Sequence, residues 1–131
     1  MNKEEIVQMM ERNCQQSSGF MTVGYDDLES CRAESDLIDA CIATGDVNGI
    51  RYMIEDSMTE LKRYKKYELT QVVLQVCFNH QEEIDLSTME EIQDAIEEIG
   101  EIELKWGICI EKDEDSADDV TVCMIGGYKK I

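Results

Sequence analysis

The chain has 131 residues, of which 43% are hydrophobic and 32% charged, a mixture that suits one globular domain and excludes a disordered or fibrous protein. Thirty acidic side chains against twelve basic ones give a formal net charge of −18, which repels DNA, RNA and anionic lipid. We therefore expect no nucleic-acid partner and no membrane partner, whereas a basic patch on a protein partner is compatible with this charge.

The N-terminus and the Cys and His content bear on compartment and metal binding. Residues 1–6 lack the basic flank and apolar run of a signal peptide, and no apolar stretch is long enough to cross a membrane, so we expect a cytoplasmic protein. His80 is the only histidine and has no close ligand pair, which predicts no zinc site. The cysteines are widely spaced without a Cys-x-x-Cys pair and are expected to stay reduced thiols: Cys14, Cys31, Cys41, Cys77, Cys109 and Cys123.

The N-terminal region predicts a short helix and a short strand. Lys3 to about Gln15 carries apolar residues at helical spacing, and Asn2 can cap this amphipathic helix. The residues Ser17-Ser18-Gly19 break the helix. A short strand is expected over Phe20–Val23, ending at Gly24.

Three elements are expected over the next forty or so residues. Asp26 and Asp27 lead into a helical turn, since acids suit a helix N-terminus. The segment 37–44 fits a strand or a helix by its pattern, and we interpret it as a strand. Asp46 can cap the helix that follows, whose apolar stripe is formed by Ile50, Met53, Ile54, Met58 and Leu61.

The middle of the chain predicts a loop, a buried strand and a second helix. The basic cluster at 62–67 is a weak nucleic-acid patch, and a solvated loop is the preferred interpretation. The β-branched run 72–78 is typical of a buried strand. Ser87 and Glu90 form the pattern of a capping box for a helix that Gly100 ends. Its expected buried face consists of Leu86, Met89, Ile92, Ile96 and Ile99.

The last third predicts a hairpin, because 102–110 and 120–124 both alternate between apolar and polar residues. The acidic loop 111–119 would join the two strands. A calcium site is one interpretation of this loop, but an EF-hand loop that began at Asp113 would need glycine and glutamate where this chain has Asp118 and Met124. We therefore predict a solvated turn and no metal site.

Together these elements predict an α+β fold: a mixed sheet of about four strands with two main helices, 46–61 and 88–99, packed on it, plus a short N-terminal helix. No proline, linker or repeat marks a boundary. We treat 1–131 as a single domain, with a short helix and linker at 1–18 and a sheet–helix core at 19–131.

Three stretches carry a resemblance to a known family. The segment 19–28, Gly-Phe-Met-Thr-Val-Gly-Tyr-Asp-Asp-Leu, is similar to a loop of the form Gly-Leu-Ile-Asn-Val-Asp-Phe-Ala-Asp-Val. The segment 43–46 resembles a strand, glycine turn and helix start, and 106–107 with 120–128 resembles a closing hairpin. From about residue 3 to residue 128, the order of elements resembles the C-terminal domain of the tubulin/FtsZ family, with the end of the preceding central helix attached.

The resemblance implies a four-stranded mixed sheet with two helices, but no nucleotide site. The family binds GTP in an N-terminal domain with a glycine-rich phosphate loop, and this sequence has no such loop, so we expect a stand-alone module without a GTPase domain or a cofactor. The family's catalytic loop supplies Asn-x-Asp-x-x-Asp, where this chain has Thr22, Gly24 and Asp27. Asp27 alone should not activate hydrolysis, and Asp26 is one residue out of place, so we predict that the chain is not an enzyme.

The expected function is therefore a protein-interaction or assembly module whose partner is an FtsZ-like protein or a second copy of the chain. The expected interface corresponds to the family's loop that meets the next subunit: Thr22, Gly24, Asp26, Asp27 and Glu29. One alternative is that the two aspartates only favour a helix start. Another is that the chain is a small-ligand-binding or oligomeric α/β domain of unrelated function. No catalytic, cofactor-binding or metal-binding residue is predicted.

Overall fold

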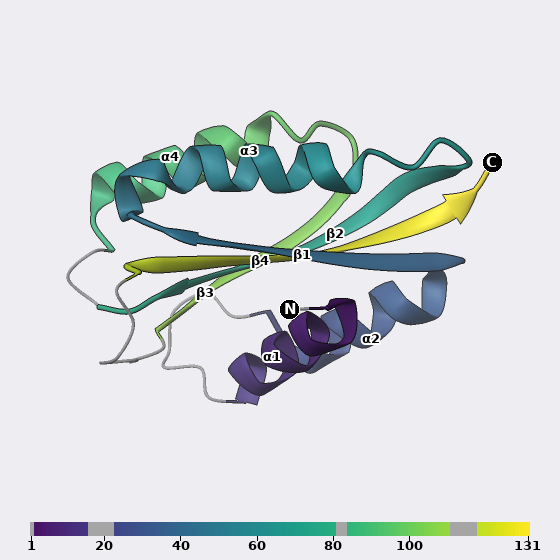
Figure 1. Cartoon of the computed structure of the whole chain (residues 1–131), viewed down its shortest axis with the longest axis horizontal. Coiled ribbons are helices and arrows are strands. Elements are labelled where there is room, and N and C mark those ends of the chain that lie inside the picture. Colours follow the sequence, from purple (N-terminus) through teal and green to yellow (C-terminus); the bar gives the residue numbers. More distant parts are fainter. Residues whose placement is uncertain (1, 16–22, 81–83, 111–117) are drawn as a thin grey trace.

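A computed structural model of the chain describes residues 2–15, 23–80, 84–110 and 118–131. One four-stranded sheet lies between two layers of helices, with α3 and α4 on one face and α1 and α2 on the other (Figure 1). The predicted α+β fold is thereby confirmed. The elements are α1 (Lys3–Gln15), α2 (Tyr25–Glu34), β1 (Leu37–Gly45), the 3-10 turn η1 (Val47–Gly49), α3 (Ile50–Leu61), β2 (Tyr67–Phe78), α4 (Leu86–Glu97), β3 (Glu103–Ile110) and β4 (Val120–Lys130).

The strands lie in the order β1-β4-β2-β3. β4 pairs antiparallel with both β1 and β2, while β2 and β3 are parallel. The predicted hairpin of 102–110 with 120–124 is therefore wrong, because β2 separates β3 from β4. The alternation of the two segments shows which side chains share a face, but it does not identify the neighbouring strand. A parallel pair needs a crossover connection, and α4 supplies it between β2 and β3.

The layer of α3 and α4 builds the larger part of the core. Ile50, Ile54 and Leu61 are at most 1% exposed, and they pack against apolar side chains of the sheet. The predicted stripe on α3 is confirmed, with Met53 only partly buried. Asp46 does act as a cap, but for η1, which leads directly into α3; its carboxylate accepts a hydrogen bond from the Asn48 backbone N–H at 2.9 Å.

The start of α4 differs from the prediction. The Asp85 carboxylate accepts the Thr88 backbone N–H at 2.8 Å, and this hydrogen bond lowers the pKa of Asp85. The predicted capping box of Ser87 and Glu90 is wrong because Ser87 already lies inside the first turn, where it cannot be the N-cap. Leu86 is 77% exposed, so its predicted burial is also wrong. The chain leaves the helix as expected through Gly100, whose φ of 85° lies in the left-handed region.

The layer of α1 and α2 forms a second, smaller core on the other sheet face. This core contains Ile6, Val7 and Met10 of α1, which pack with Leu28 and Cys31 of α2 on the same face of the sheet. Instead of a single turn, α2 is a helix of ten residues. The strand predicted at 20–23 lies outside the described residues except for its last member, which is buried but belongs to no strand. Among the described helices, none is long and apolar enough to cross a membrane.

Candidate partner surface at the start of α2

Apolar packing against the sheet holds the first turn of α2 in place. Leu28 and Cys31 are at most 3% exposed and anchor the helix on the sheet. Gly24 is the N-cap residue, with extended backbone angles, φ −80° and ψ 159°. This anchoring leaves Tyr25 and Asp26 exposed to solvent. Four of the five predicted interface residues lie on this turn or next to it, while Thr22 lies outside the described residues.

Asp27 is bound on both of its carboxylate oxygens. Oδ2 accepts the Gly24 backbone N–H at 2.9 Å, and Oδ1 lies 3.2 Å from the Lys105 ammonium group of β3. The contact raises the pKa of Lys105, chiefly through the hydrogen bond that its ammonium group donates to Asp27. The Asp27 carboxylate therefore caps its own helix and ties it to the edge strand, which agrees with the alternative interpretation of this residue as a helix-start acid.

The outward side of this turn combines acidic and aromatic groups. Asp26 is exposed and makes no hydrogen bond or ion pair within the described part of the chain. Tyr25 is 46% exposed, and the Glu29 carboxylate raises its pKa, mainly by accepting its hydrogen bond. We call the group Gly24, Tyr25, Asp26, Asp27 and Glu29 the α2 surface.

The end of α1 lies beside the α2 surface. Arg32 of α2 pairs with Glu11 of α1 at 3.3 Å. Burial raises the pKa of the Cys14 thiol, and the Asp27 and Glu11 carboxylates raise it further. The exposed Asp26 carboxylate is the group of the α2 surface that attracts a cation.

A disulfide joins Cys77 of β2 to Cys109 of β3, so the prediction that all the cysteines stay reduced is wrong. The two residues are register partners in the parallel pair, with Cα atoms 4.6 Å apart. The incorrect hairpin placed β3 beside β4, where these sulfurs could not meet. Cys14, Cys31 and Cys41 remain free thiols.

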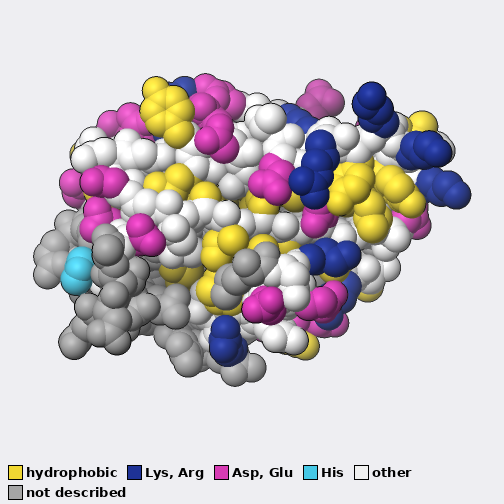
Figure 2. Space-filling model, viewed as in Figure 1, with side chains coloured by type: hydrophobic (Ala, Val, Ile, Leu, Met, Phe, Trp, Pro, Cys, Tyr) yellow, Lys and Arg dark blue, Asp and Glu magenta, His cyan; other side chains and the backbone are white. Residues whose placement is uncertain are grey.

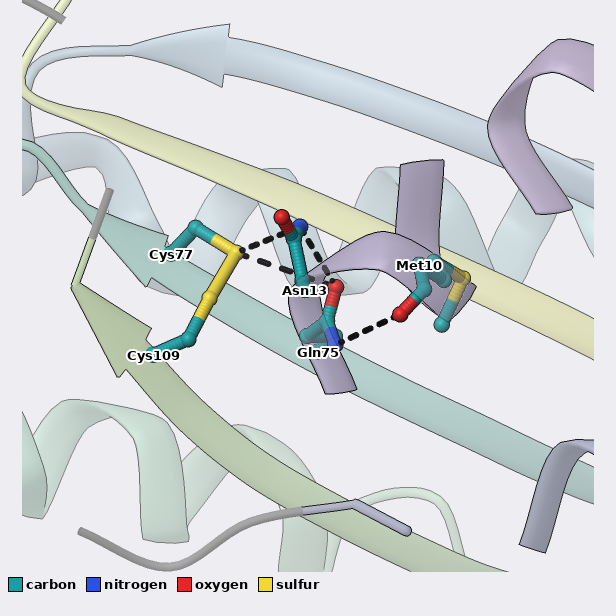
Figure 3. The surroundings of a disulfide bond; sticks show 5 residues. All are labelled: Met10, Asn13, Gln75, Cys77 and Cys109. Atoms are coloured by element: carbon teal, nitrogen blue, oxygen red, sulfur yellow. Dashed lines mark hydrogen bonds between the residues drawn. A yellow bond between two sulfur atoms is a disulfide. The ribbon is translucent and has the colours of Figure 1, made fainter. Parts of the chain in front are cut away.

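Two buried amide side chains lie beside this disulfide, between α1 and β2 (Figure 3). The Asn13 side-chain amide donates to Gln75 Oε1 at 2.9 Å and to Cys77 Sγ at 3.3 Å. Gln75 Nε2 donates to the Met10 carbonyl oxygen at 3.4 Å. The sequence does not reveal this network, because Asn13 is a polar residue near a helix end and only the helix-to-sheet contact buries it. These hydrogen bonds link α1 to β2.

Two hollows bear on the ligand-binding alternative. One, of about 190 Å³, lies between α3 and α4 over Met58, Ala95 and Ile99, and another, of about 240 Å³, lies beside Trp106 and Ile96. Both are smaller than the roughly 300 Å³ at which small-molecule sites begin. Within the described residues, no group of three or more His, Cys, Asp or Glu side chains could hold a metal ion. The acidic loop considered for calcium lies largely outside those residues.

The sheet order and the helix layers define a partial tubulin/FtsZ-like fold. One similar solved structure is the empty FtsZ dimer of M. jannaschii, with a TM-score of 0.55 and 17% identity over 86% of this chain and 36% of the FtsZ chain. Another is a GTPγS-form protofilament of TubZ from Bacillus thuringiensis serovar israelensis, with a TM-score of 0.50 and 17% identity over 69% of this chain and 24% of the TubZ chain.

These likenesses concern only part of each relative. The chain spans about a third of the FtsZ chain and about a quarter of the TubZ chain. At 17% identity they show the fold, and the resemblance predicted from the sequence is confirmed at that level. No protein-family model matches the chain. No curated protein matches it either.

Proposed function

We propose that this chain is a non-enzymatic protein-interaction module that takes part in the assembly of an FtsZ-like partner and meets that partner through the α2 surface. The observation that carries the proposal is the first turn of α2, where Asp26 and Tyr25 face solvent while Leu28 holds the turn on a rigid sheet. Both structural relatives are assemblies, a dimer of FtsZ and a protofilament of TubZ.

The contacts of Asp27 support a non-enzymatic role. A general base must lie within hydrogen-bond reach of the water that it deprotonates. The Asp27 carboxylate instead faces its own helix start and the edge strand, where it accepts the Gly24 N–H and pairs with the Lys105 ammonium group. Gly24 has no side chain at the place where the resembling loop carries a carboxylate, and Asp26, two positions further along the chain, is exposed to solvent.

The partner is a protein with Lys or Arg side chains at its contact site. Exposed charges of this kind act mainly on the rate of association, and salt weakens them over a Debye length of about 8 Å at physiological ionic strength. The exposed ring of Tyr25 supplies apolar contact area next to the acids. We therefore expect fast, salt-sensitive binding.

The test compares two charge reversals of the same size. Asp26→Lys changes the α2 surface, and Asp56→Lys changes an exposed acid of α3 on the opposite face of the sheet. Binding to the purified FtsZ-like protein of the same organism is followed by stopped-flow light scattering at about 50 mM salt. We expect Asp26→Lys to slow association by roughly threefold to tenfold and Asp56→Lys to leave it nearly unchanged. Absence of binding by the wild-type chain, or equal rates for both variants, would remove the proposal.

A further inference from the structure

One end of the sheet gathers half of the chain's basic residues. Lys62, Arg63, Lys65 and Lys66 follow α3, and Lys129 and Lys130 end β4. The pairing of β2 with β4 joins these segments, because Tyr67 is the register partner of Lys130 and the Ile131 N–H donates to the Lys66 carbonyl oxygen at 3.2 Å. Figure 2 shows the Lys and Arg side chains gathered at the end of the molecule where the C-terminus lies. We call these six residues the basic end.

The lysines of the basic end carry unpaired charges. All five, Lys62, Lys65, Lys66, Lys129 and Lys130, are exposed, and none makes an ion pair within the part of the chain that the structure describes. This is unexpected in a chain with thirty acidic residues. The negative end of the α3 dipole accounts for cations in the last turn of that helix or just after it, but not for those on the β2 and β4 side.

Among the described residues, four acids lie around the six cations of the basic end, and three of them form an ion pair or a hydrogen bond there. Asp39 and Glu60 pair with Arg63 at 3.1 and 3.4 Å, and the Asp36 carboxylate accepts the Lys130 backbone N–H at 2.9 Å. Glu68 is the register partner of Lys129 on β2. The surface thus keeps an excess of positive charge while the whole chain is strongly negative.

Aromatic packing holds the basic end in a fixed shape. The Tyr128 hydroxyl donates to the Leu61 carbonyl oxygen at 2.7 Å and ties the end of α3 to β4. The Tyr64 ring packs edge-on against Tyr128 and Tyr67, with centroids 5.1 and 6.5 Å away, and the Arg63 guanidinium lies 5.4 Å from the Tyr64 ring centre. Because this frame is rigid, binding at the basic end has to order only the lysine side chains.

We propose that the basic end binds an acidic peptide segment of a partner protein. This goes beyond the proposed function, since the basic end shares no residue with the α2 surface and has the opposite charge. Lysine ammonium groups are flexible point charges that suit carboxylates in an extended segment without strict geometry. The partly buried rings of Tyr64 and Tyr67 offer apolar contact beside them.

The limited size of the basic end favours a short peptide over larger polyanions. A nucleic acid carries one charge per roughly 1.7 Å of duplex and extends past the patch, where it meets a surface dominated by Asp and Glu (Figure 2). A flat anionic membrane meets the same acids. A second copy of the chain carries a net charge of −18, so the chain repels it more strongly than it repels a segment with six carboxylates.

The test measures the fluorescence anisotropy of a labelled dodecapeptide containing six glutamates. The variant Lys66→Glu/Lys130→Glu reverses two charges of the basic end. The control Arg12→Glu reverses one exposed cation of α1 that makes no ion pair within the described residues, and circular dichroism checks that each protein is folded. We expect the wild-type chain and the control to bind the peptide at about 20 mM salt, and the double variant to bind at least roughly tenfold more weakly.

Each result supports the proposal or overturns it. Loss of peptide binding in the double variant alone, together with weakening by salt, supports it. Absence of binding by the wild-type chain, or equal binding by the double variant, overturns it. Tighter binding of an oligouridine or of anionic vesicles than of the peptide identifies a different partner class and overturns it too. Self-association that the double variant abolishes and the peptide does not inhibit would assign the basic end to a second copy instead.

Discussion

Gly127 lies where α2 comes closest to the sheet. A Cβ atom at this position would be 2.2 Å from Ser35 Oγ and 2.9 Å from Cys31 Sγ, both on the α2 side of β4. Neither distance is compatible with van der Waals contact. Gly127 therefore sets how closely α2 packs, and through α2 it sets the position of the candidate partner surface. In the sequence, the Gly126-Gly127 pair gave no hint of this role.

Gly127→Ala should lower the free energy of unfolding by about 1 to 3 kcal/mol, the usual cost of overpacking a filled core. Alanine suits a strand better than glycine, so a loss would come from the clash and not from backbone propensity. Urea unfolding measures the change. The double variant Gly127→Ala/Ser35→Ala removes the nearest obstructing atom and should recover part of the loss, with Ser35→Ala completing the cycle. A neutral Gly127→Ala would show that α2 can move away freely.

Residue-scale predictions from the sequence were best where one local rule applied. The α3 stripe and the turn at Gly100 follow from helical periodicity and from backbone conformation, and both are confirmed. The predicted cap of α4 was wrong because Asp85 and Ser87 are both residue types that cap helices. Only the observed start of the helix identifies Asp85 as the N-cap. The ion pair of Asp27 with Lys105 could not be predicted from the sequence either, since Lys105 lies 78 positions away along the chain but only 3.2 Å away in space.

The edge strand β3 connects the sheet to the start of α2. It is an edge strand that pairs with β2 alone, and the Cys77–Cys109 bond fixes it covalently to that neighbour. It also carries Lys105, which holds the start of α2. Loosening β3 would therefore act on the α2 surface as well as on the sheet edge.

Removing the disulfide should lower the free energy of unfolding by about 3 to 4 kcal/mol, the loop-closure value for a sequence separation of 32. Cys77→Ala/Cys109→Ala is compared with the wild-type chain by urea unfolding, with and without a dithiol reductant. Reductant should destabilise the wild-type chain and leave the variant unchanged. Hydrogen exchange should quicken first in β3 and at the start of α2. If reductant changed neither the midpoint nor the exchange of β3, the disulfide would have no part in holding this strand.

The elements themselves were largely predictable, but their pairing was not. Apolar patterns predicted α3, α4 and β3 at nearly their observed positions and the C-terminal part of β2, because each pattern reports local burial. The pattern of 37–44 fitted a strand or a helix, and the choice of a strand is confirmed by β1. Strand order depends on which edges meet across long sequence separations, and periodicity does not encode it. That gap explains two misses, the parallel β2–β3 pair and the disulfide within it. The buried Asn13–Gln75 contact was missed because it depends on how α1 packs on the sheet.

At the scale of the whole molecule, charge is unevenly distributed. The sequence fixes the total at −18, but strand pairing places half of the cations at one end of the sheet. The remaining surface is left with a large excess of carboxylates, visible over the layer of α3 and α4 (Figure 2). This distribution is the basis of both proposals, a cationic partner for the α2 surface and an acidic segment for the basic end.

The same excess of carboxylates predicts how salt affects stability. Repulsion among thirty acids opposes the compact state, and salt screens exposed charges over a Debye length that falls from about 30 Å at 0.01 M to about 3 Å at 1 M. The described ion pairs are mostly solvent-exposed and lose little when screened. Raising NaCl from about 0.02 to 0.5 M should therefore raise the thermal midpoint by roughly 3 to 8 °C. Differential scanning calorimetry measures it, with an equal osmolality of glycerol as the control for solvent effects. A midpoint that fell with NaCl would mean that the ion pairs outweigh the repulsion, and the acidic surface would then be stabilising.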